Sequence, residues 1–557
     1  MDTLLTLLAL ALILLPGWVL WLHITGPQPS TEVAITGLAF ASAIAMVVLY
    51  AISYVGLTWF VVVWLAALAW AAYRLAVLRP RIRVDGALAL LMLGAAAVRF
   101  LPVLVQNFPP GWDPYFHLLI VRLIEQSGAH VASLSPFEDI PINYPTGTHL
   151  LIALIVKVTG ASRYGVYQAF LASFSTLTCL QVYAWVHAAS GNRRWALYAL
   201  AAYAFLAVQG SIGYYEWGGV PNLVGMYVLA GCFTLVAQSD AGERRWWALP
   251  PMYLAIALAN HHVLMAAFGA MLALLVWLAL RPERRADARR LLLGGCIAGV
   301  IAAPALVLHF HASGEAVGAT GLLTVVEPPN TLWVIATGYG LVFFGAMLAG
   351  GALYARAPRL WALRPELLAP AIALLVLFVL FEQAGRLFTP SRFVTDLVYP
   401  LSAFAGLAFL ALERRFKRPL LPLVVLLFAA NGAHYVKQFQ PVIEPDRLAA
   451  YRWIEANTRP DTMVIDIYVH APVLTNRISS YTALPSSELV GQAKNRRLLE
   501  RMQTGEVQVE RTPYPVVLLV RGELPRYAPP EAVVWRGGEF TILDVNPRVS
   551  ARLPARQ

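Results

Sequence analysis

Apolar runs long enough to cross a lipid bilayer recur along most of this chain. A transmembrane helix needs about 20 consecutive apolar residues. Of the 557 residues, 59% are hydrophobic and 13% are charged, whereas a soluble domain is about 45–50% apolar and about 25% charged. The sequence therefore predicts a helical membrane protein with about 14 spans. The predicted spans are residues 3–23, 34–54, 57–77, 86–106, 165–188, 196–213, 222–238, 247–260, 263–280, 291–310, 331–354, 366–382, 392–411 and 420–438.

The cysteines argue against a disulfide framework, and the first residues argue against a signal peptide. Cys179, Cys232 and Cys296 each lie inside an apolar run, so no disulfide framework or cysteine-based metal site is predicted. Residues 1–24 carry no basic leader and no small-residue cleavage site. We interpret them as a retained membrane helix and not as a signal peptide.

The distribution of basic residues predicts which loops face the cytoplasm. The formal net charge of +11 indicates either nucleic-acid binding or basic cytoplasmic loops. When the predicted spans alternate across the membrane, basic residues crowd into every second loop. The crowded loops contain Arg74, Arg79, Arg81 and Arg83; Arg193 and Arg194; Arg244 and Arg245; Arg281, Arg284, Arg285, Arg289 and Arg290; Arg356, Arg359 and Arg364; and Arg414, Arg415, Lys417 and Arg418. We predict that these loops are cytoplasmic, that the other loops are periplasmic or extracellular, and that no nucleic acid is bound.

The sequence divides into three predicted parts. Residues 1–85 supply additional transmembrane helices, residues 86–443 form the core, and the polar residues 444–557 form a small soluble α/β domain on the non-cytoplasmic side. The core has a long outer loop, 107–164, whose short apolar stretch 146–160 we expect to lie at the membrane surface, since a span there would invert every later loop. The predicted fold class is mostly α: a polytopic helical membrane protein with a small C-terminal α/β domain.

Three carboxylates in separate outer loops are candidate functional residues. Asp113 follows a span and lies among aromatic residues, where a carboxylate is costly unless it is hydrated, paired or bound to metal. Its competing role is a helix N-cap before Pro114. Glu216 lies in a turn rich in glycine and proline, and Glu327 ends an apolar stretch before two prolines. If their loops converge, these oxygen ligands suit Mg²⁺ or Mn²⁺.

Basic and imidazole side chains on the outer side are further candidate functional residues. Arg386 and Arg392 flank the outer end of a span, where an arginine suits a lipid phosphate or simply extends to a headgroup. His117 lies one helical turn after the first carboxylate. His261 and His262 are suited to metal binding or proton transfer, although an isolated histidine is more often structural.

No nucleotide-binding or hydrolase motif is present. The chain contains no Walker loop, no Gly-x-Ser-x-Gly and no HExxH. We therefore expect no nucleotide cofactor. A group transferred on the outer side must then arrive on an activated carrier such as a lipid phosphate.

Several segments, in this order, resemble the catalytic subunit of oligosaccharyltransferases and, with it, the C-type (GT-C) glycosyltransferases. GWDPYFHLLIVRLIE resembles the Asp-Pro-Tyr motif of that subunit's first outer loop, and INYPTGTHLL resembles the loop's closing Tyr-Pro-x-Gly. GYYEWGGVPN takes the place of the second acidic motif, and TVVE that of a Thr-Ile-x-Glu motif. SRFVTDLVYPLSAFAG resembles the Arg-Phe helix that contacts the donor phosphate, and YRWIEANTRPDTMVIDIYV the start of the C-terminal domain. The resemblance covers residues 86–480.

The resemblance implies an activity and roles for individual residues. These enzymes use polyprenyl-phosphate or polyprenyl-diphosphate sugars. By position, Asp113 would be the essential carboxylate, Glu216 and Glu327 the further catalytic carboxylates and metal ligands with it, and Arg392 with Arg386 the donor-phosphate ligands. The family's Asp-x-Asp pattern is missing at the second motif and some members work without metal, so dependence on Mg²⁺ or Mn²⁺ stays open. The residues expected to line an acceptor pocket are His117, Tyr144, Tyr215, Trp217, His261 and His262.

The chain is thus predicted to be an enzyme, a glycosyltransferase using a lipid-linked sugar donor. The Trp-Trp-Asp motif that recognises the protein acceptor in oligosaccharyltransferases has no counterpart near VIDIYVHAP. The expected acceptor is therefore a lipid, glycan or polymer. The alternatives are an oligosaccharyltransferase-like enzyme that glycosylates protein, a transporter or flippase for lipid-linked saccharides, and a non-catalytic scaffold. Few charges at the centres of the spans and no clear internal repeat favour the enzyme over the transporter.

Overall fold

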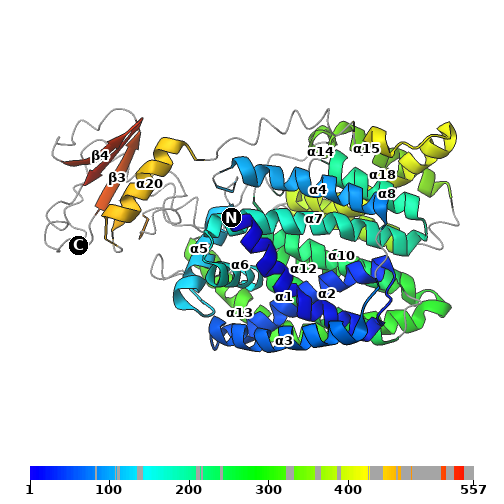
Figure 1. The fold of residues 1–557 in the computed structure, drawn as a ribbon. Helices are drawn as coiled ribbons and strands as arrows, with labels where there is room; N and C mark the ends of the chain where they lie inside the picture. Colours follow the sequence, from blue (N-terminus) through cyan, green and yellow to red (C-terminus); the bar gives the residue numbers. More distant parts are fainter. Residues whose placement is uncertain are drawn as a thin grey trace.

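Most of the chain lies in one bundle of helices, and a small sheet with one helix lies beyond one end of it (Figure 1). The computed structural model describes residues 1–81, 85–106, 108–109, 113–133, 142, 144–207, 214, 218–238, 243–320, 332–357, 365–384, 390–424, 426, 443–459, 462–465, 478–479, 516–521 and 532–544.

The first four predicted spans are confirmed as long apolar helices. They are α1 (Asp2–Thr25), α2 (Thr31–Ser53), α3 (Leu57–Leu78) and α4 (Gly86–Val105). The close contact of α1 with α2 depends on a small residue, because a Cβ added at Gly17 would lie 2.7 Å from the Cα of Ala41. Trp21 Nε1 also donates a hydrogen bond to the carbonyl of Val33 at 2.7 Å. The additional N-terminal helices are therefore packed against one another within the bundle.

The next segment contains both short and long helices. They are α5 (Asp113–Ser127), α6 (Gly147–Thr159), α7 (Arg163–Ser190), α8 (Arg193–Ala201), the π-helix η1 (Ala202–Leu206) and α10 (Val220–Ala237). With 13 residues, α6 is about 20 Å long, which is shorter than the roughly 30 Å hydrocarbon layer. It is buried along residues 147–156, so this short helix packs into the protein.

The second half of the bundle continues with helices broken by local backbone features. They are η3 (Glu243–Ala248), α11 (Leu249–Ala259), α12 (His261–Ala279), η4 (Pro282–Arg284), α13 (Arg285–Thr320), α14 (Leu332–Tyr339), α15 (Leu341–Ala355), α17 (Pro365–Ala384) and α18 (Pro390–Phe416). The predicted span 331–354 is divided into α14 and α15 at Gly340, whose φ of 85° interrupts a right-handed helix. The predicted span 247–260 is the 11-residue α11.

Eight helices in the described part of the chain are long and apolar enough to cross a membrane. They are α1, α2, α3, α4, α7, α10, α12 and the Val394–Phe416 part of α18. The chain is therefore a multi-pass membrane protein, as the apolar runs predict. Most of the predicted span 420–438 lies outside the described residues.

The C-terminal unit combines helix α20 (Pro445–Asn457) with a five-stranded sheet. Its strands are β1 (Met463–Ile465), β2 (Ile478–Ser479), β3 (Val516–Arg521), β4 (Val533–Gly537) and β5 (Phe540–Asp544). The order is β2-β1-β3-β5-β4, in which β1 is parallel to both of its neighbours and β5 is antiparallel to both of its own. The Arg447 guanidinium of α20 lies 4.8 Å from the centre of the Phe540 ring. The fold is thus the predicted helical membrane protein with a small α/β unit.

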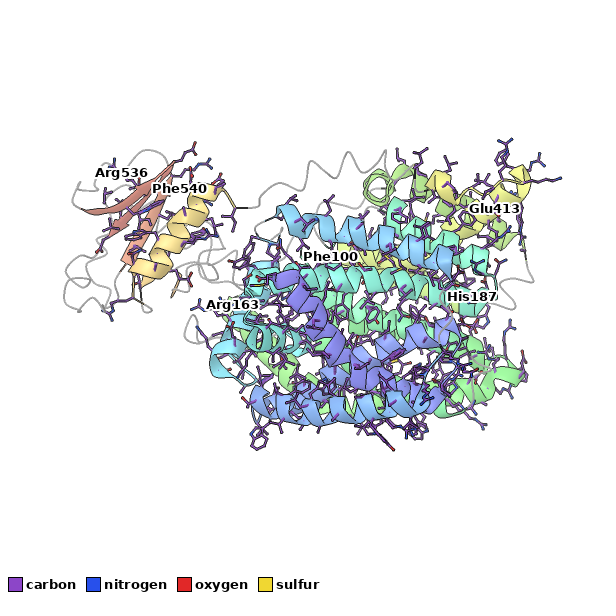
Figure 2. All side chains as sticks on the ribbon, viewed as in Figure 1. Phe100, Arg163, His187, Glu413, Arg536 and Phe540 are labelled. Carbon is purple, nitrogen blue, oxygen red and sulfur yellow. The ribbon has the colours of Figure 1, made fainter. Side chains whose placement is uncertain are left out.

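The two ends of the bundle differ in the residues they carry. Figure 2 shows Arg163 at one end, with His187 and Glu413 at the opposite end. At the Arg163 end, which we call the site end, the Asp2 carboxylate accepts hydrogen bonds from the backbone and hydroxyl of Ser162. The other end, which we call the arginine-rich end, holds described arginines from the crowded loops.

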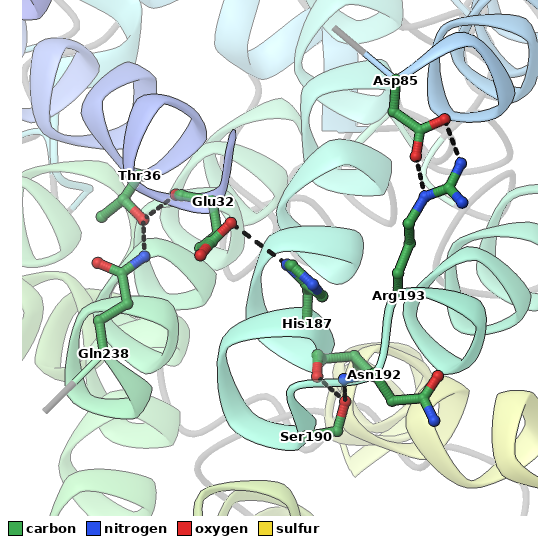
Figure 3. A network of polar contacts seen from close by, with 9 residues as sticks. Glu32, Thr36, Asp85, His187, Ser190, Asn192, Arg193 and Gln238 are labelled. Atoms are coloured by element: carbon green, nitrogen blue, oxygen red, sulfur yellow. Dashed lines mark hydrogen bonds and ion pairs between the residues drawn. The ribbon is translucent and has the colours of Figure 1, made fainter. Parts of the chain in front are cut away.

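Several of those arginines form ion pairs, and two of them join helices at this end. Arg193 bonds the carboxylate of Asp85, and Arg194 lies 2.8 Å from that of Glu413. Close to the first pair, His187 Nδ1 lies 3.2 Å from the Glu32 carboxylate (Figure 3). The described arginines of the crowded loops thus gather at one end of the bundle, as positively charged cytoplasmic loops would.

The Asp85–Arg193 pair makes stability at this end depend on pH. The two hydrogen bonds from Arg193 lower the pKa of the Asp85 carboxyl below its usual value. A carboxyl with a lowered folded-state pKa stabilises the protein above its unfolded-state pKa, and that contribution is lost as the pH falls through the folded-state pKa. Arg193 is exposed to solvent, so the pair contributes at most about 1 kcal/mol.

We therefore expect Asp85→Asn to lower the melting temperature at pH 7, and this effect to shrink as the pH falls from 7 through the acid range in which the Asp85 carboxyl becomes protonated. Melting of the purified protein in detergent across this pH range measures the difference. Glu283→Gln, at an exposed carboxylate of the same end, is the control. A difference for Asp85→Asn that persists unchanged at the lowest pH would contradict this assignment.

Candidate functional site

The site end holds a cluster of buried and half-buried polar, aromatic and imidazole side chains, which we call the histidine cluster. It consists of His117 from α5, Tyr144, His149 from α6, and Asn260 and His261 at the start of α12. His117 Nδ1 lies 2.9 Å from His149 Nε2 in a hydrogen bond. The Tyr144 ring lies edge-on to His117, His149 and His261, with ring centres 5.1, 5.7 and 5.5 Å apart.

Local sequence accounts for the position of the cluster. The Asn260 side chain accepts a hydrogen bond from the backbone of Val263 at 3.1 Å, which makes it the N-cap of α12. The same side chain donates to the hydroxyl of Tyr144. Asn260 therefore caps α12 and also joins Tyr144 to the start of this helix.

Burial fixes the protonation state of one member of the histidine cluster. It lowers the pKa of His149 to about 3, so this imidazole is neutral near pH 7. A neutral imidazole has one N–H donor and one acceptor nitrogen. His149 can therefore take part in the hydrogen bond with His117 without carrying a positive charge.

A second group, which we call the Asp396 cluster, surrounds a buried carboxylate of α18. Tyr214 Oη donates to Asp396 Oδ1 at 2.9 Å, and Asn222 Nδ2 donates to the same oxygen at 3.0 Å. His262 Nε2 lies 3.3 Å from Asp396 Oδ2. Asp396 and His262 are each 1% exposed. The carboxylate thus joins the segment before α10, the first turn of α10 and the start of α12 to α18.

The two clusters are connected through neighbouring residues. Asn260 and His261 belong to the histidine cluster, and the adjacent His262 belongs to the Asp396 cluster. In addition, Tyr167 of α7 stacks on His117 with ring centres 6.4 Å apart and donates a hydrogen bond to the carbonyl of Gly218. Gly218 lies just before α10, which carries Asn222. The clusters are therefore parts of one polar region at the site end.

A buried arginine lies next to this region. Arg99 of α4 is 1% exposed and donates to Ser175 Oγ at 3.0 Å and to the carbonyl of Ala204 at 3.4 Å. Ala204 belongs to the π-helix η1, a local irregularity that often occurs at functional positions. Arg99 thus holds η1 against α4 and α7 from within the membrane-spanning part of the bundle.

The structure places some of the predicted site residues and leaves others undescribed. His117, Tyr144 and His261 are brought together, and His262 is paired with Asp396. Asp113 is the first residue of α5, one helical turn before His117, and Arg392 lies in α18, one turn before Asp396; their side chains are outside the described set. The predicted residues Tyr215, Glu216, Trp217, Glu327 and Arg386 lie outside the described residues.

Sequence reasoning overlooked several members of the polar region. Asp396, Asn222 and His149 lie within or beside apolar runs and look like ordinary polar residues of a membrane helix. Asp396 alone carried a usable signal, because an ionisable residue inside a predicted span indicates a functional position.

The predicted metal ligands are the carboxylates of Asp113, Glu216 and Glu327, whose side chains lie outside the described residues. Among the residues that the structure describes, no three His, Cys, Asp or Glu side chains are grouped so that they could hold a metal ion. The carboxylate at the centre of the polar region, Asp396, accepts hydrogen bonds from a tyrosine and an amide and faces an imidazole. These neighbours do not form the oxygen-rich ligand set that Mg²⁺ prefers. The described residues therefore do not fit a metal site.

The helical arrangement and the polar region at one end define a polytopic membrane protein with a GT-C-like fold. The crystal structure of ArnT from Cupriavidus metallidurans bound to undecaprenyl phosphate covers 84% of this chain and 99% of its own, with a TM-score of 0.57 and 13% identity. The apo structure of the same protein matches over the same shares with a TM-score of 0.55 and 13% identity. A structure of the mycobacterial arabinofuranosyltransferase AftD has a TM-score of 0.49 and 14% identity, covering 82% of this chain and 40% of its own.

The sequence assigns the chain to a particular family. The family of unknown function DUF6541 matches residues 10–333, which is more than half of the 557 residues, so the chain belongs to this family. No curated protein matches the chain.

Proposed function

We propose that this protein is a membrane glycosyltransferase. It would move a sugar from a polyprenyl-phosphate or polyprenyl-diphosphate donor to a hydroxyl of a lipid, glycan or polymer acceptor on the non-cytoplasmic face. The observation that carries the proposal is the buried polar region at one end of a GT-C-like bundle. The similar ArnT structure holds undecaprenyl phosphate, which supports a lipid phosphate as the donor carrier.

Two positions of the proposed reaction lie next to described members of the polar region. Asp113 begins the helix that carries His117, and Arg392 lies in the helix that carries Asp396. The first turn of α12 contacts α18 through His262 and is linked to α5 through Tyr144. A proposed base and a proposed phosphate ligand are therefore carried by segments that converge on the same end of the protein.

The proposed reaction is a displacement at the anomeric carbon of the donor sugar. Asp113 takes the proton of the acceptor hydroxyl, and the oxygen forms a new bond to that carbon. The bond from the carbon to the phosphate oxygen breaks, and the lipid phosphate leaves with the electron pair. Arg392, with Arg386, stabilises the charge that develops on the phosphate. Glu216 and Glu327 orient the acceptor, and the proton taken by Asp113 is afterwards released to water.

The proposal gives each part of the chain a role. Residues 86–443 form the catalytic core, residues 1–85 add helices to its side, and residues 444–557 form a separate α/β domain on the same side as the site. The pocket for the acceptor is proposed to include His117, Tyr144, Tyr215, Trp217, His261 and His262.

Transfer by the purified wild-type protein tests the proposal directly. We expect that radiolabelled sugar, supplied on polyprenyl phosphate in vesicles with lipid and glycan acceptors, becomes covalently attached to a second molecule. Boiled protein is the control for spontaneous transfer. If no label reaches an acceptor with any lipid-linked sugar, the proposed function is wrong.

A transporter for lipid-linked saccharides is the second candidate. The buried charges Arg99 and Asp396 within predicted spans favour it, because intramembrane ionisable residues often mark transport pathways. The same vesicles distinguish the two functions. Movement of the labelled lipid to the other leaflet without transfer of its sugar would support the transporter.

A further inference from the structure

The carboxylate of Asp396 has an unusual combination of burial and contacts. It is 1% exposed, and it interacts with three side chains from distant parts of the sequence: Tyr214, Asn222 and His262. Removing a carboxylate from water is strongly unfavourable unless hydrogen bonds and an opposite charge compensate for it. A buried pair of this kind is often no more stabilising than apolar packing. Its presence here therefore suggests a role other than stability.

The ion pairs at the arginine-rich end are much more exposed to solvent. The side chain of Arg193 is 54% exposed, and that of Arg194 is 72% exposed. Those arginines keep contact with water while they join helices. In the His262–Asp396 pair, the side chains are 1% and 0% exposed.

The backbone of α18 is also weakened at this position. Pro400 lies inside α18 and has no N–H, so it cannot donate to the carbonyl four residues earlier, that of Asp396. A missing hydrogen bond of this kind allows a helix to bend. The side-chain bonds of Asp396 hold the weakened turn to the neighbouring segments.

Each bond of Asp396 reaches a segment that the proposed reaction uses. Arg392, the proposed phosphate ligand, lies one helical turn before Asp396 in α18. Tyr214 lies two residues before Glu216, the proposed second carboxylate. His262 lies in the first turn of α12, beside the histidine cluster.

We infer that Asp396 is a positioning residue that fixes the phosphate-binding turn of α18 relative to the Tyr214 segment and α12. This inference rests on the proposed function. It assigns Asp396 no contact with the substrate, since Oδ1 already accepts two hydrogen bonds and Oδ2 faces His262 within the protein. Its effect is on the placement of the groups that do react.

Two substitutions cut these bonds with little change of shape. Asp396→Asn keeps the side-chain volume but removes the charge, and Tyr214→Phe removes one donor to Oδ1. The matched control is Asp287→Asn at the arginine-rich end. Asp287 is also a buried carboxylate, 6% exposed, and it bonds Arg284 at 2.6 Å. The full-length variants are purified in detergent, and each is compared with wild type for kcat, donor KM and melting temperature.

We expect Asp396→Asn to lower kcat about 100-fold, because small misplacements of reacting groups have effects of this size. Tyr214→Phe should lower kcat about tenfold, the effect of one hydrogen bond to a charged group. The double variant should be no slower than Asp396→Asn, because Tyr214 acts through Asp396. Asp287→Asn should lower the melting temperature and leave kcat unchanged.

Two results would overturn the inference. Wild-type kcat in both single variants would do so, as would a double variant whose loss is the product of the two single losses. If Asp396→Asn does not fold, Tyr214→Phe tests the same contact alone, and wild-type kcat in that variant would then overturn it. Absence of transfer by the wild-type protein has a different meaning, because it rejects the proposed function itself.

Discussion

Asp113→Asn is expected to reduce sugar transfer by about a thousandfold while the protein keeps its fold. A general base in this position typically accelerates proton transfer by about 10²–10⁴-fold, and an amide cannot accept the proton of the acceptor hydroxyl. The amide keeps the size of the side chain and can still cap a helix. The loss should therefore appear in kcat and not in the melting temperature. Transfer of radiolabelled sugar from polyprenyl phosphate measures it.

Glu125→Gln is the matched control for this variant. Glu125 is a carboxylate of the same helix, α5, and its side chain pairs with Arg163 at 2.8 Å at the same end of the protein. Losing that half-exposed pair should leave transfer unchanged. Wild-type turnover by Asp113→Asn, or an equal loss in Glu125→Gln, would remove Asp113 from the proposed mechanism.

The second large effect concerns the contact between α15 and α18. A Cβ added at Gly350 of α15 would collide with the carbonyl oxygen of Phe404 in α18. The obstructing atom belongs to the backbone, so the helices must separate to make room. We expect Gly350→Ala to destabilise the protein by about 3 kcal/mol, the upper part of the usual range for overpacking. Transfer should fall as well, because α18 carries Arg392 and Asp396.

The neighbouring glycine supplies the control. A Cβ added at Gly351 would meet no atom within 4 Å. Alanine favours a helix over glycine by about 1 kcal/mol, so Gly351→Ala should be neutral or stabilising. Thermal unfolding of both variants in the same detergent makes the comparison. Equal melting temperatures for Gly350→Ala and Gly351→Ala would contradict the close contact.

The sequence predicted the helical membrane class because length and hydropathy directly control bilayer insertion, although eight helices of the described part, and not 14, are long and apolar enough to cross a membrane. The apolar runs that form α1 to α4 could be identified without knowing which helices they pack against. The arginines that form pairs with Asp85 and Glu413 likewise marked one end of the bundle through their positions alone. Hydropathy does not detect breaks in the backbone, so the turn at Gly340 and the π-helix η1 were not predicted.

The polar region was predicted only in part, for a physical reason. His117 and Tyr144 were suspected because they lie near Asp113 or in a motif that resembles a known loop. Asn222 and Asp396 are 174 residues apart, and no sequence pattern near either residue predicts that they interact. Their significance depends on a pairing that only the folded chain produces.

The hydrogen bonds between Asp2 and Ser162 have a consequence for how this chain would enter its membrane. They hold the beginning of α1 at the end of the bundle where the polar region lies, opposite the loops crowded with arginine. In the proposed orientation, with the arginine-rich end in the cytoplasm, the start of the first span crosses the bilayer ahead of the rest of that span, and a polypeptide fused before Met1 would cross with it. A large, stably folded fusion at this terminus would oppose the proposed orientation, in which the polar region lies on the non-cytoplasmic side.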